Sequence, residues 1–416
     1  MKVLICATVA LLALTGCGGG DDGPPQSSSS SSSGGGGLPP PASAPPLKTE
    51  MAARFGIVNF PIGAAIEPAA ITNATDSALL LKHFSSVTAE NAMKPDTVWP
   101  NEPGSNPPRP TIAPDFDPAD AIYDFALNNQ IRVRGHTLLW HRTAPSWMFA
   151  GDQSDPVNYR IGVQQNLRNY IFAVVEHFPQ VYAWDVVNEV ATDTPNAANP
   201  YRTDSPWYIA YSVGGGDGAE YVRDAFTFAA QARTAAGRSQ ATMKLMLNDY
   251  NTELPGKRDN ILRIVQSLID AGAPIDGVGH QFHLQLNADV AQVTAALQAV
   301  KALNSMLVNH VTELDVSIYA DPGECFAQQA IPPCLTDVGT TPSQTLLSQQ
   351  ALKYRALFEA FDTEGVESVT FWGIADNHTW LNSFPVNRTN HPLLFDRAGN
   401  PKWAFWAVVD PTLAVP

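Results

Sequence analysis

The 416-residue sequence is poor in basic residues, in cysteine and in long hydrophobic runs. It has 25 lysines and arginines against 40 aspartates and glutamates, so its formal net charge is −15. Surfaces that bind nucleic acid concentrate lysine and arginine, and this composition therefore argues against a nucleic-acid partner. The apolar run at residues 3–14 is shorter than the roughly 20 residues of a membrane-spanning helix. The apolar fraction of 44% is still ample for a large core.

The short apolar run at the N-terminus has the pattern of an export signal. Lys2 precedes it, and a run of this length is typical of the hydrophobic region of a signal peptide. It ends in Leu-Thr-Gly-Cys at residues 14–17, which resembles the lipobox of bacterial lipoproteins. We predict a signal peptide at residues 1–16 and a lipid anchor on Cys17 at the bacterial cell surface, with an ordinary secretory signal as the alternative. Gly18 in place of aspartate gives the outer membrane a mild preference.

Two segments of different composition follow the predicted signal peptide. Residues 17–47 are rich in glycine, serine and proline and have little to bury, which predicts a flexible linker. Residues 48–416 alternate apolar and helical patterns and are predicted to form the folded domain. We find no internal repeat and no sign of a second domain.

The remaining cysteines and histidines give little support to a metal site. Cys6 lies in the signal peptide, which leaves Cys325 and Cys334, nine positions apart. Outside the cytoplasm these two are predicted to form a disulfide that closes a surface loop. Two thiols alone are weak evidence for zinc, and His280 and His283 are three apart on a predicted strand, where they face opposite ways. We expect neither a metal nor another cofactor.

Eight apolar runs that alternate with helical segments predict a single (β/α)₈ barrel, the TIM-barrel fold. The predicted strands are residues 62–66, 84–89, 131–140, 181–187, 244–248, 277–284, 308–316 and 367–374. The clearest helices are residues 117–130, 163–178, 220–235, 257–271, 290–303 and 342–363. A doubly wound sheet is the alternative, but the turn after the first strand lacks the glycine-rich phosphate-binding pattern.

Polar side chains gather where the predicted strands end. In a (β/α)₈ barrel the active site lies at the C-terminal ends of the strands. These side chains, in chain order, are Glu90, Asn91, Lys94, His136, Trp140, Asn188, Glu189, Asn248, Asp249, Tyr250, Asn251, Gln281, His283, Glu313, Asp315, Trp372, Asp376, Asn377, His378 and Trp380. Any one of them could be a hydrogen-bonded core residue, but their recurrence at seven consecutive strand ends predicts a site.

Two acids on a buried strand define the predicted chemistry. Glu313 and Asp315 are two positions apart, so a strand directs them to one face, where burial is costly without partners. Glu189 ends a second apolar strand. Paired carboxyl groups are what glycoside hydrolysis requires, with one acid to protonate the leaving oxygen and one carboxylate to act on the anomeric carbon.

Seven motifs resemble those of glycoside hydrolase family 10, the barrel xylanases, and they occur in family order across residues 48–410. They are residues 88–94, 135–141, 184–189, 247–251, 279–283, 312–316 and 371–373 with Trp380. The resemblance implies that Glu189 is the general acid/base, that Glu313 is the nucleophile and that His283 and Asp315 position the nucleophile. It implies sugar contacts for Glu90, Asn91, Lys94, His136, Trp140, Asn188, Tyr250, Gln281, His283, Trp372 and Trp380.

The resemblance implies a retaining endo-β-1,4-xylanase that acts on xylan and xylo-oligosaccharides. Independently of the resemblance, we take a monomer as the default state. Retention predicts carboxyl groups about 5–5.5 Å apart, and the acid role predicts a raised pKa for Glu189. A glucanase or mixed-linkage glycanase of the same barrel type, and a surface protein that binds xylan without cutting it, are the alternatives. Pro95 departs from the tryptophan of many members, and the long segments 194–218 and 321–341 are expected to shape the cleft.

Overall fold

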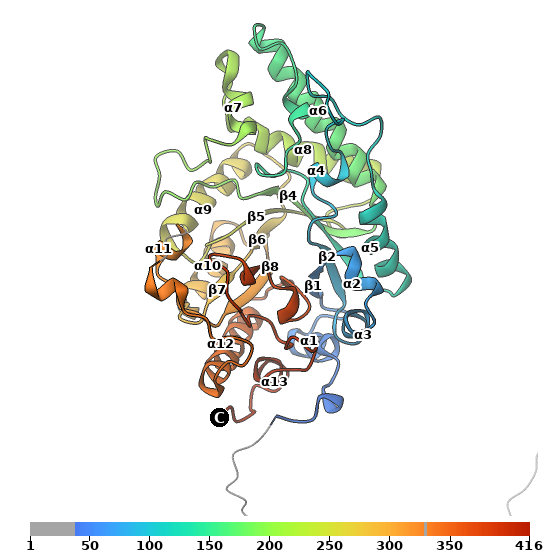
Figure 1. The fold of residues 1–416 in the computed structure, drawn as a ribbon. Helices are drawn as coiled ribbons and strands as arrows, with labels where there is room; N and C mark the ends of the chain where they lie inside the picture. The colour runs from blue at the N-terminus through green and yellow to red at the C-terminus, as the bar shows by residue number, and fades with distance from the viewer. Residues whose placement is uncertain (1–37, 328–330) are drawn as a thin grey trace, which may run out of the picture. The chain divides into compact units, whose positions relative to one another are not determined.

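The computed structural model describes residues 38–327 and 331–416 of the chain (Figure 1). The predicted signal peptide, the predicted anchor Cys17 and the linker up to residue 37 lie outside the described residues. Within residues 38–47, a short 3₁₀ helix, η1 (Pro41–Ser43), is followed by the buried Ala44 and by the start of the first α-helix.

In the described part of the chain, nine strands form one parallel sheet. The strands are β1 (Ile62–Ile66), β2 (Ser86–Ala89), β3 (Arg132–His136), β4 (Val181–Asn188), β5 (Lys244–Asp249), β6 (Gly277–His280), β7 (His283–Gln285), β8 (Val308–Ser317) and β9 (Ser368–Phe371). Strands β1 to β6 pair in sequence order, β6 and β7 both pair with β8, β8 pairs with β9, and β9 pairs with β1, so the sheet closes on itself. The predicted (β/α)₈ barrel is therefore confirmed.

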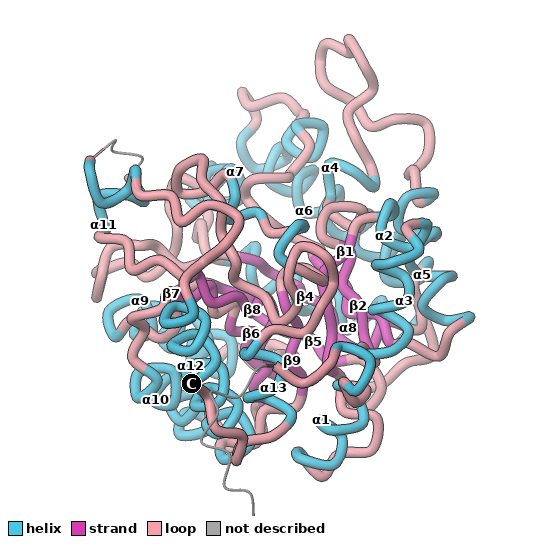
Figure 2. The backbone as a smooth tube through the Cα atoms, turned by 60° about the horizontal axis from the view of Figure 1, so that its bottom comes forward, coloured by secondary structure: helices cyan, strands magenta, loops and turns pink. Residues whose placement is uncertain are grey.

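Helices surround this ring of strands, as Figure 2 shows with the strands in magenta at the centre. The helices are α1 (Leu47–Phe55), α2 (Pro68–Thr72), α3 (Ala74–His83), α4 (Pro95–Val98), α5 (Asp117–Asn128), α6 (Pro156–His177), α7 (Pro206–Ser212), α8 (Glu220–Ala235), α9 (Pro255–Asp270), α10 (Val290–Leu303), α11 (Gly323–Phe326), α12 (Gln344–Thr363) and α13 (Trp403–Val409). Helix starts carry the expected local signals. Asp155 caps α6 with Pro156 at its first position, and Asp289 caps α10.

Three predicted strands were clearly too long, and the one predicted at 367–374 is observed as β9 (Ser368–Phe371). The strand predicted at 277–284 is broken into β6 and β7, because Phe282 has a positive φ of 50° and interrupts the ladder. The strand predicted at 131–140 ends at His136. After His136 the chain still runs beside β4, as the hydrogen bond from Leu138 N–H to the carbonyl of Asp185 shows. It no longer forms the regular backbone pairs of a parallel strand.

The core explains why the strands read as nearly continuous apolar runs. All five residues of β1 and all ten of β8 are buried, as expected for parallel strands covered by helices on one face and enclosed in a barrel on the other. Inside the barrel, the buried Arg134 of β3 forms an ion pair with Asp185 of β4 and hydrogen-bonds His310 Nδ1 of β8 at 2.9 Å.

No helix in the described ranges is both long and apolar enough to cross a bilayer.

Candidate active site

The C-terminal half of β8 carries both acids of the predicted pair, and His283 of β7 joins them. In its charged form, His283 donates from Nδ1 to Asp315 Oδ2 at 2.8 Å and from Nε2 to Glu313 Oε2 at 3.2 Å. The side chain of Asp315 is fully buried and that of Glu313 is 6% exposed. The two acids therefore have the partner that their burial requires.

This arrangement favours a charged imidazole between two carboxylates. Burial alone would lower the pKa of His283, but Asp315 and Glu313 outweigh it and raise that pKa to about 10. Burial alone would likewise raise the pKa of Glu313, but the hydrogen bond from His283, the charges of His136 and His283 and the hydrogen bond from Asn248 lower it overall. Glu313 is therefore an ionised carboxylate at neutral pH.

Asn248 at the end of β5 also holds Glu313; it belongs to the polar residues predicted at the strand ends, but no role was assigned to it from the sequence. Its Nδ2 donates to Glu313 Oε1 and to Asn188 Oδ1, each at 2.8 Å, and its Oδ1 accepts from Thr312 Oγ1 at 2.6 Å. Thr312 and Glu313 are sequence neighbours that reach the same amide because the register of β8 against β9 shifts between Val311 and Leu314. The feature of the sequence that pointed to Asn248 was the run of polar residues at 248–251.

Glu189 lies immediately after β4, in a left-handed backbone conformation with φ of 56°. Trp140 Nε1 donates to its Oε2 at 2.8 Å, and Gln281 Nε2 donates to its Oε1 at 3.4 Å. Arg142, whose side chain is 67% exposed, places Nε 3.9 Å from Oε2. The sequence analysis missed Arg142, although it follows directly on a motif that was recognised.

The surroundings of Glu189 favour its protonated form. Burial raises the pKa of this carboxyl, and the negative charges of Asp249 and Glu313 raise it further, against the opposing effects of Trp140 and Arg142. The expectation of a raised pKa is confirmed. The site thus holds one carboxyl with a raised pKa and another with a lowered pKa, which is the division that acid catalysis and nucleophilic attack demand.

Amides connect the two acids. Asn188 Oδ1 accepts from Asn248 at 2.8 Å and from Gln281 Nε2 at 3.2 Å, so its Nδ2 is the group left to donate to a sugar hydroxyl. Gln281 bridges from this amide to Glu189. The break at Phe282 separates Gln281 from His283, and both still reach the site.

Aromatic rings flank the acids. Trp380 donates from Nε1 to Asp315 Oδ2 at 3.0 Å, and its ring lies 4.9 Å from that of His283. Trp372 makes edge contacts with His136 at 5.3 Å and with His283 at 6.3 Å. His136 in turn hydrogen-bonds Asp185 Oδ2 at 3.0 Å, which fixes its ring.

The polar residues after β2 form the outer part of the site. Lys94 Nζ lies 5.0 Å from the ring centre of Trp140 and donates to Asn91 Oδ1 at 2.7 Å. Asn91 donates to Glu67, a partner that the sequence analysis missed. Burial raises the pKa of Glu90, with Glu67 adding to the effect.

Tyr250 belongs to a separate set of contacts beyond Glu189. Its hydroxyl donates to Asp193 Oδ1 at 2.6 Å and accepts from Arg202 Nη2 at 3.0 Å. Among the described residues, no direct hydrogen bond joins Tyr250 to Glu189 or Glu313, so its predicted contact with sugar stays a prediction. Across residues 38–327 and 331–416, no group of three or more histidine, cysteine or acidic side chains is placed to hold a metal ion.

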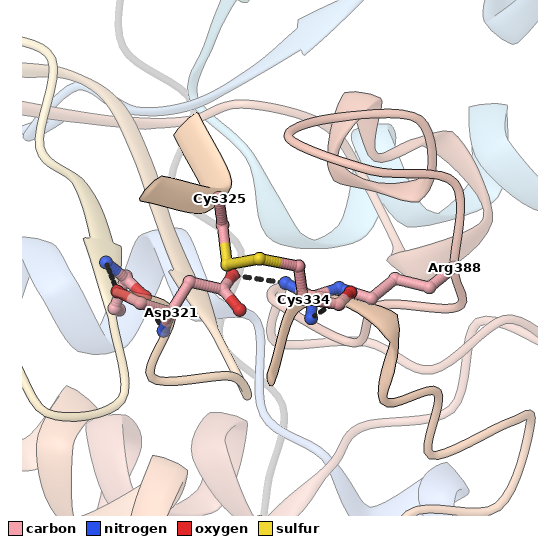
Figure 3. The surroundings of a disulfide bond; sticks show 5 residues. Asp321, Cys325, Cys334 and Arg388 are labelled. Carbon is pink, nitrogen blue, oxygen red and sulfur yellow. Dashed lines mark hydrogen bonds and ion pairs between the residues drawn. A yellow bond between two sulfur atoms is a disulfide. The ribbon is translucent and has the colours of Figure 1, made fainter. Parts of the chain in front are cut away.

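The loop after β8 contains the predicted disulfide between Cys325 and Cys334, which is confirmed (Figure 3). Arg388, from the segment after β9, forms an ion pair with Asp321 and donates to the carbonyl of Cys334 at 3.3 Å. Arg388 also stacks over the ring of Tyr319, 3.6 Å from its centre. The loop is therefore tied to the barrel at both ends of the disulfide.

Comparisons with known proteins agree with this geometry. The sequence pattern of the family described as glycosyl hydrolase family 10 matches residues 49–411. A thermostable celloxylanase from Thermoclostridium stercorarium is 39% identical over 367 residues, which cover 85% of each chain. A beta-1,4-xylanase from Dictyoglomus thermophilum is 38% identical over 355 residues, covering 84% of this chain and 88% of that one. The crystal structure of xylanase B from Clostridium stercorarium F9 matches with a TM-score of 0.73 at 39% identity, covering 88% of this chain and 100% of that chain.

Proposed function

The chain belongs to glycosyl hydrolase family 10, and on that premise we propose that it is a retaining endo-1,4-β-xylanase that hydrolyses internal bonds of xylan. One observation carries the assignment of roles. Glu313 is a buried carboxylate held by a charged imidazole and an amide, while Glu189 has the raised pKa of an acid. We assign Glu313 as the nucleophile and Glu189 as the acid/base.

In the first step, Glu313 attacks the anomeric carbon of the sugar. The bond from that carbon to the glycosidic oxygen breaks, and the oxygen takes the proton of Glu189 as the shortened chain leaves. The product is a glycosyl ester on Glu313. His283 and Asn248 hold the two oxygens of Glu313 and so orient the carboxylate for attack.

In the second step, Glu189 is ionised and acts as a base. It takes a proton from a water molecule, whose oxygen attacks the anomeric carbon, and the ester bond to Glu313 breaks. Glu189 is protonated again, Glu313 is a carboxylate again, and the sugar keeps its original configuration. Asn188 is placed to bind a hydroxyl of the sugar with Nδ2, and Trp372 and Trp380 provide apolar faces for its ring.

The first test measures reducing sugar released from xylan and from carboxymethyl-cellulose. Wild type should release sugar from xylan and little from cellulose, and Glu313→Ala should lose about 10⁴-fold or more of its activity, because the covalent step requires this carboxylate. Glu176→Ala is the matched control, since Glu176 is an exposed glutamate of α6 outside the site. Full activity of Glu313→Ala would contradict the assignment.

A second candidate substrate is β-1,4-glucan, which the name of the celloxylanase relative brings into consideration. Comparable rates on xylan and cellulose would favour this broader glycanase. Binding of xylan without release of sugar by the wild type would instead favour a surface binding protein.

We further propose that the protein is exported and held at the bacterial cell surface by a lipid on Cys17, with a mild preference for the outer membrane. The support is the motif at residues 14–17, the glycine at position 18 and the linker composition that follows. A linker of this kind would let the catalytic domain reach a polymer that cannot enter the cell.

A further inference from the structure

The backbone that follows Glu189 is held by charged side chains from outside the catalytic pair. Glu189 has φ of 56°, a conformation that residues other than glycine adopt rarely. Such a conformation persists when surrounding contacts determine it. The question is which contacts hold residues 189–193 in place.

Ala191 is bound through both of its backbone polar groups. Its N–H donates to Asp249 Oδ2 at 3.0 Å, and its carbonyl accepts from Lys257 Nζ at 2.7 Å and from Arg202 Nη2 at 3.4 Å. Arg202 Nε also donates to the carbonyl of Glu189 at 3.3 Å. These side chains come from β5, from α9 and from the long segment after β4.

Lys257 is the centre of this group of contacts. Its side chain is 4% exposed, and besides Ala191 its ammonium reaches Asp193 Oδ1 at 2.9 Å and Asp249 Oδ1 at 3.3 Å. An ammonium has three protons to donate, and here it has three acceptors. The ring of Tyr250 covers it, with the centre 4.3 Å away.

Removal of this ammonium would leave the buried Asp249 carboxylate without its paired cation and the Ala191 carbonyl with only the longer hydrogen bond from Arg202. A buried carboxylate that loses its partner is strongly destabilised, so the local structure must rearrange or admit water. The rearrangement would shift the backbone at Ala191, two residues from Glu189, and would thereby change the direction of the Glu189 carboxyl. Displacement of a catalytic group by about 1 Å is enough to cost about 100-fold in rate.

We propose that Lys257 is a positioning residue that holds Glu189 in line with the leaving oxygen, an inference that rests on the acid/base role proposed above. Lys257 is buried, and its ammonium is already bonded to Ala191, Asp193 and Asp249. It acts through Ala191 and Asp249, and its removal should therefore impair proton transfer more than attack by Glu313.

The experiment compares two aryl β-xylobiosides, which differ in how much acid assistance their leaving groups need. The phenol of phenyl β-xylobioside needs protonation to leave, whereas 2,4-dinitrophenyl β-xylobioside releases the stable 2,4-dinitrophenolate anion without it. Lys257→Met should lower kcat/KM for the phenyl substrate by about 10- to 100-fold and for the dinitrophenyl substrate by less than about threefold. Lys257→Arg, which keeps the charge, should recover part of the loss on the phenyl substrate.

The ratio of the two kcat/KM values is the deciding readout, because it is independent of the fraction of correctly folded enzyme. Both leaving groups are single aromatic rings, so an altered Tyr250 would affect them alike. Lys402→Met is the matched control, since Lys402 is another buried lysine paired with an aspartate, Asp376, and makes no contact with residues 189–193. It should leave the ratio unchanged. An equal loss on both substrates in Lys257→Met would overturn the proposal, and inactivity of the wild type would instead refute the proposed function.

Discussion

Three glutamates near the strand ends show how neighbours decide the protonation of one residue type. Glu313 has donors on both oxygens and a lowered pKa, whereas burial, together with the nearby negative charges of Asp249 and Glu313, raises the pKa of Glu189. Glu253, on the loop after β5, is buried, and its Oε2 has no hydrogen-bond partner among the described residues. Burial raises the pKa of Glu253 to about 7, although its own backbone N–H, His283 and Arg258 oppose the shift.

Glu253 should make the protein less stable as the pH rises. The protonated form is favoured in the folded state, so its contribution is complete below the ordinary pKa of 4.5 and is lost as the pH rises through about 7. The loss is about 3 kcal/mol in the free energy of unfolding. Glu253→Gln should therefore be more stable relative to wild type at pH 8 than at pH 4, as measured by urea unfolding.

The comparison between the two pH values isolates the titration from the fixed cost of the substitution. Glu176→Gln, at an exposed position of α6, should show no such difference. An offset between Glu253→Gln and wild type that stayed constant from pH 4 to pH 8 would contradict the prediction.

At the scale of elements, the site depends on departures from regular structure at strand ends. The register shift in β8 brings Thr312 and Glu313 to one amide, and the break between β6 and β7 lets Gln281 and His283 contact different acids.

The end of β8 is held by hydrogen bonds that do not involve the loop closed by Cys325 and Cys334. Gln350 donates to the carbonyl of Val316 at 2.8 Å, and Asn390 donates to Ser317 Oγ at 2.9 Å.

The disulfide should stabilise the fold without being required for catalysis. It joins cysteines nine positions apart, and a loop of that length corresponds to about 2–3 kcal/mol in the chain-entropy account. The double variant Cys325→Ser, Cys334→Ser should lose about this much free energy of unfolding in urea. Its kcat/KM on xylan should be retained, because Val316 and Ser317 keep their partners. A variant of full stability but lowered activity would reverse this assignment.

At the scale of the whole molecule, the barrel gathers groups from the ends of strands β2 to β9 at one end of one sheet. The net charge of −15 is compatible with a neutral polymer as substrate, because binding of such a polymer does not require a cationic protein surface. The proposed lipid on Cys17 would then determine where the enzyme works, because charge provides no attraction to an anionic membrane.

The lipid anchor can be tested in bacteria that make the full-length chain. Growth with an alkyne-labelled fatty acid should label the wild type, and Cys17→Ser should lose the label and leave the membrane fraction, because the thiol is the site of acylation. Cys6→Ser is the matched control, since Cys6 lies in the predicted signal peptide and should leave labelling intact. An unlabelled wild type would favour the ordinary secretory signal.

Local sequence was sufficient for the order of elements and for most of the site. Apolar runs of strand length that alternate with amphipathic segments allow few architectures, and a barrel places every strand end at one face. Glu313, His283, Asp315, Asn188, Gln281 and Trp380 were therefore predicted from their positions, and the structure joins them by hydrogen bonds.

Tertiary structure alone decided what depends on contacts between distant segments. A positive φ at Phe282 and a register shift in β8 cannot be read from an apolar run, because both arise from pairing with other strands. The roles of Asn248, Arg142 and Lys257 depend on which side chains the closed barrel brings within hydrogen-bond distance of a carboxyl group. The direction of each pKa shift has the same origin, since burial and neighbouring charge are properties of the folded chain.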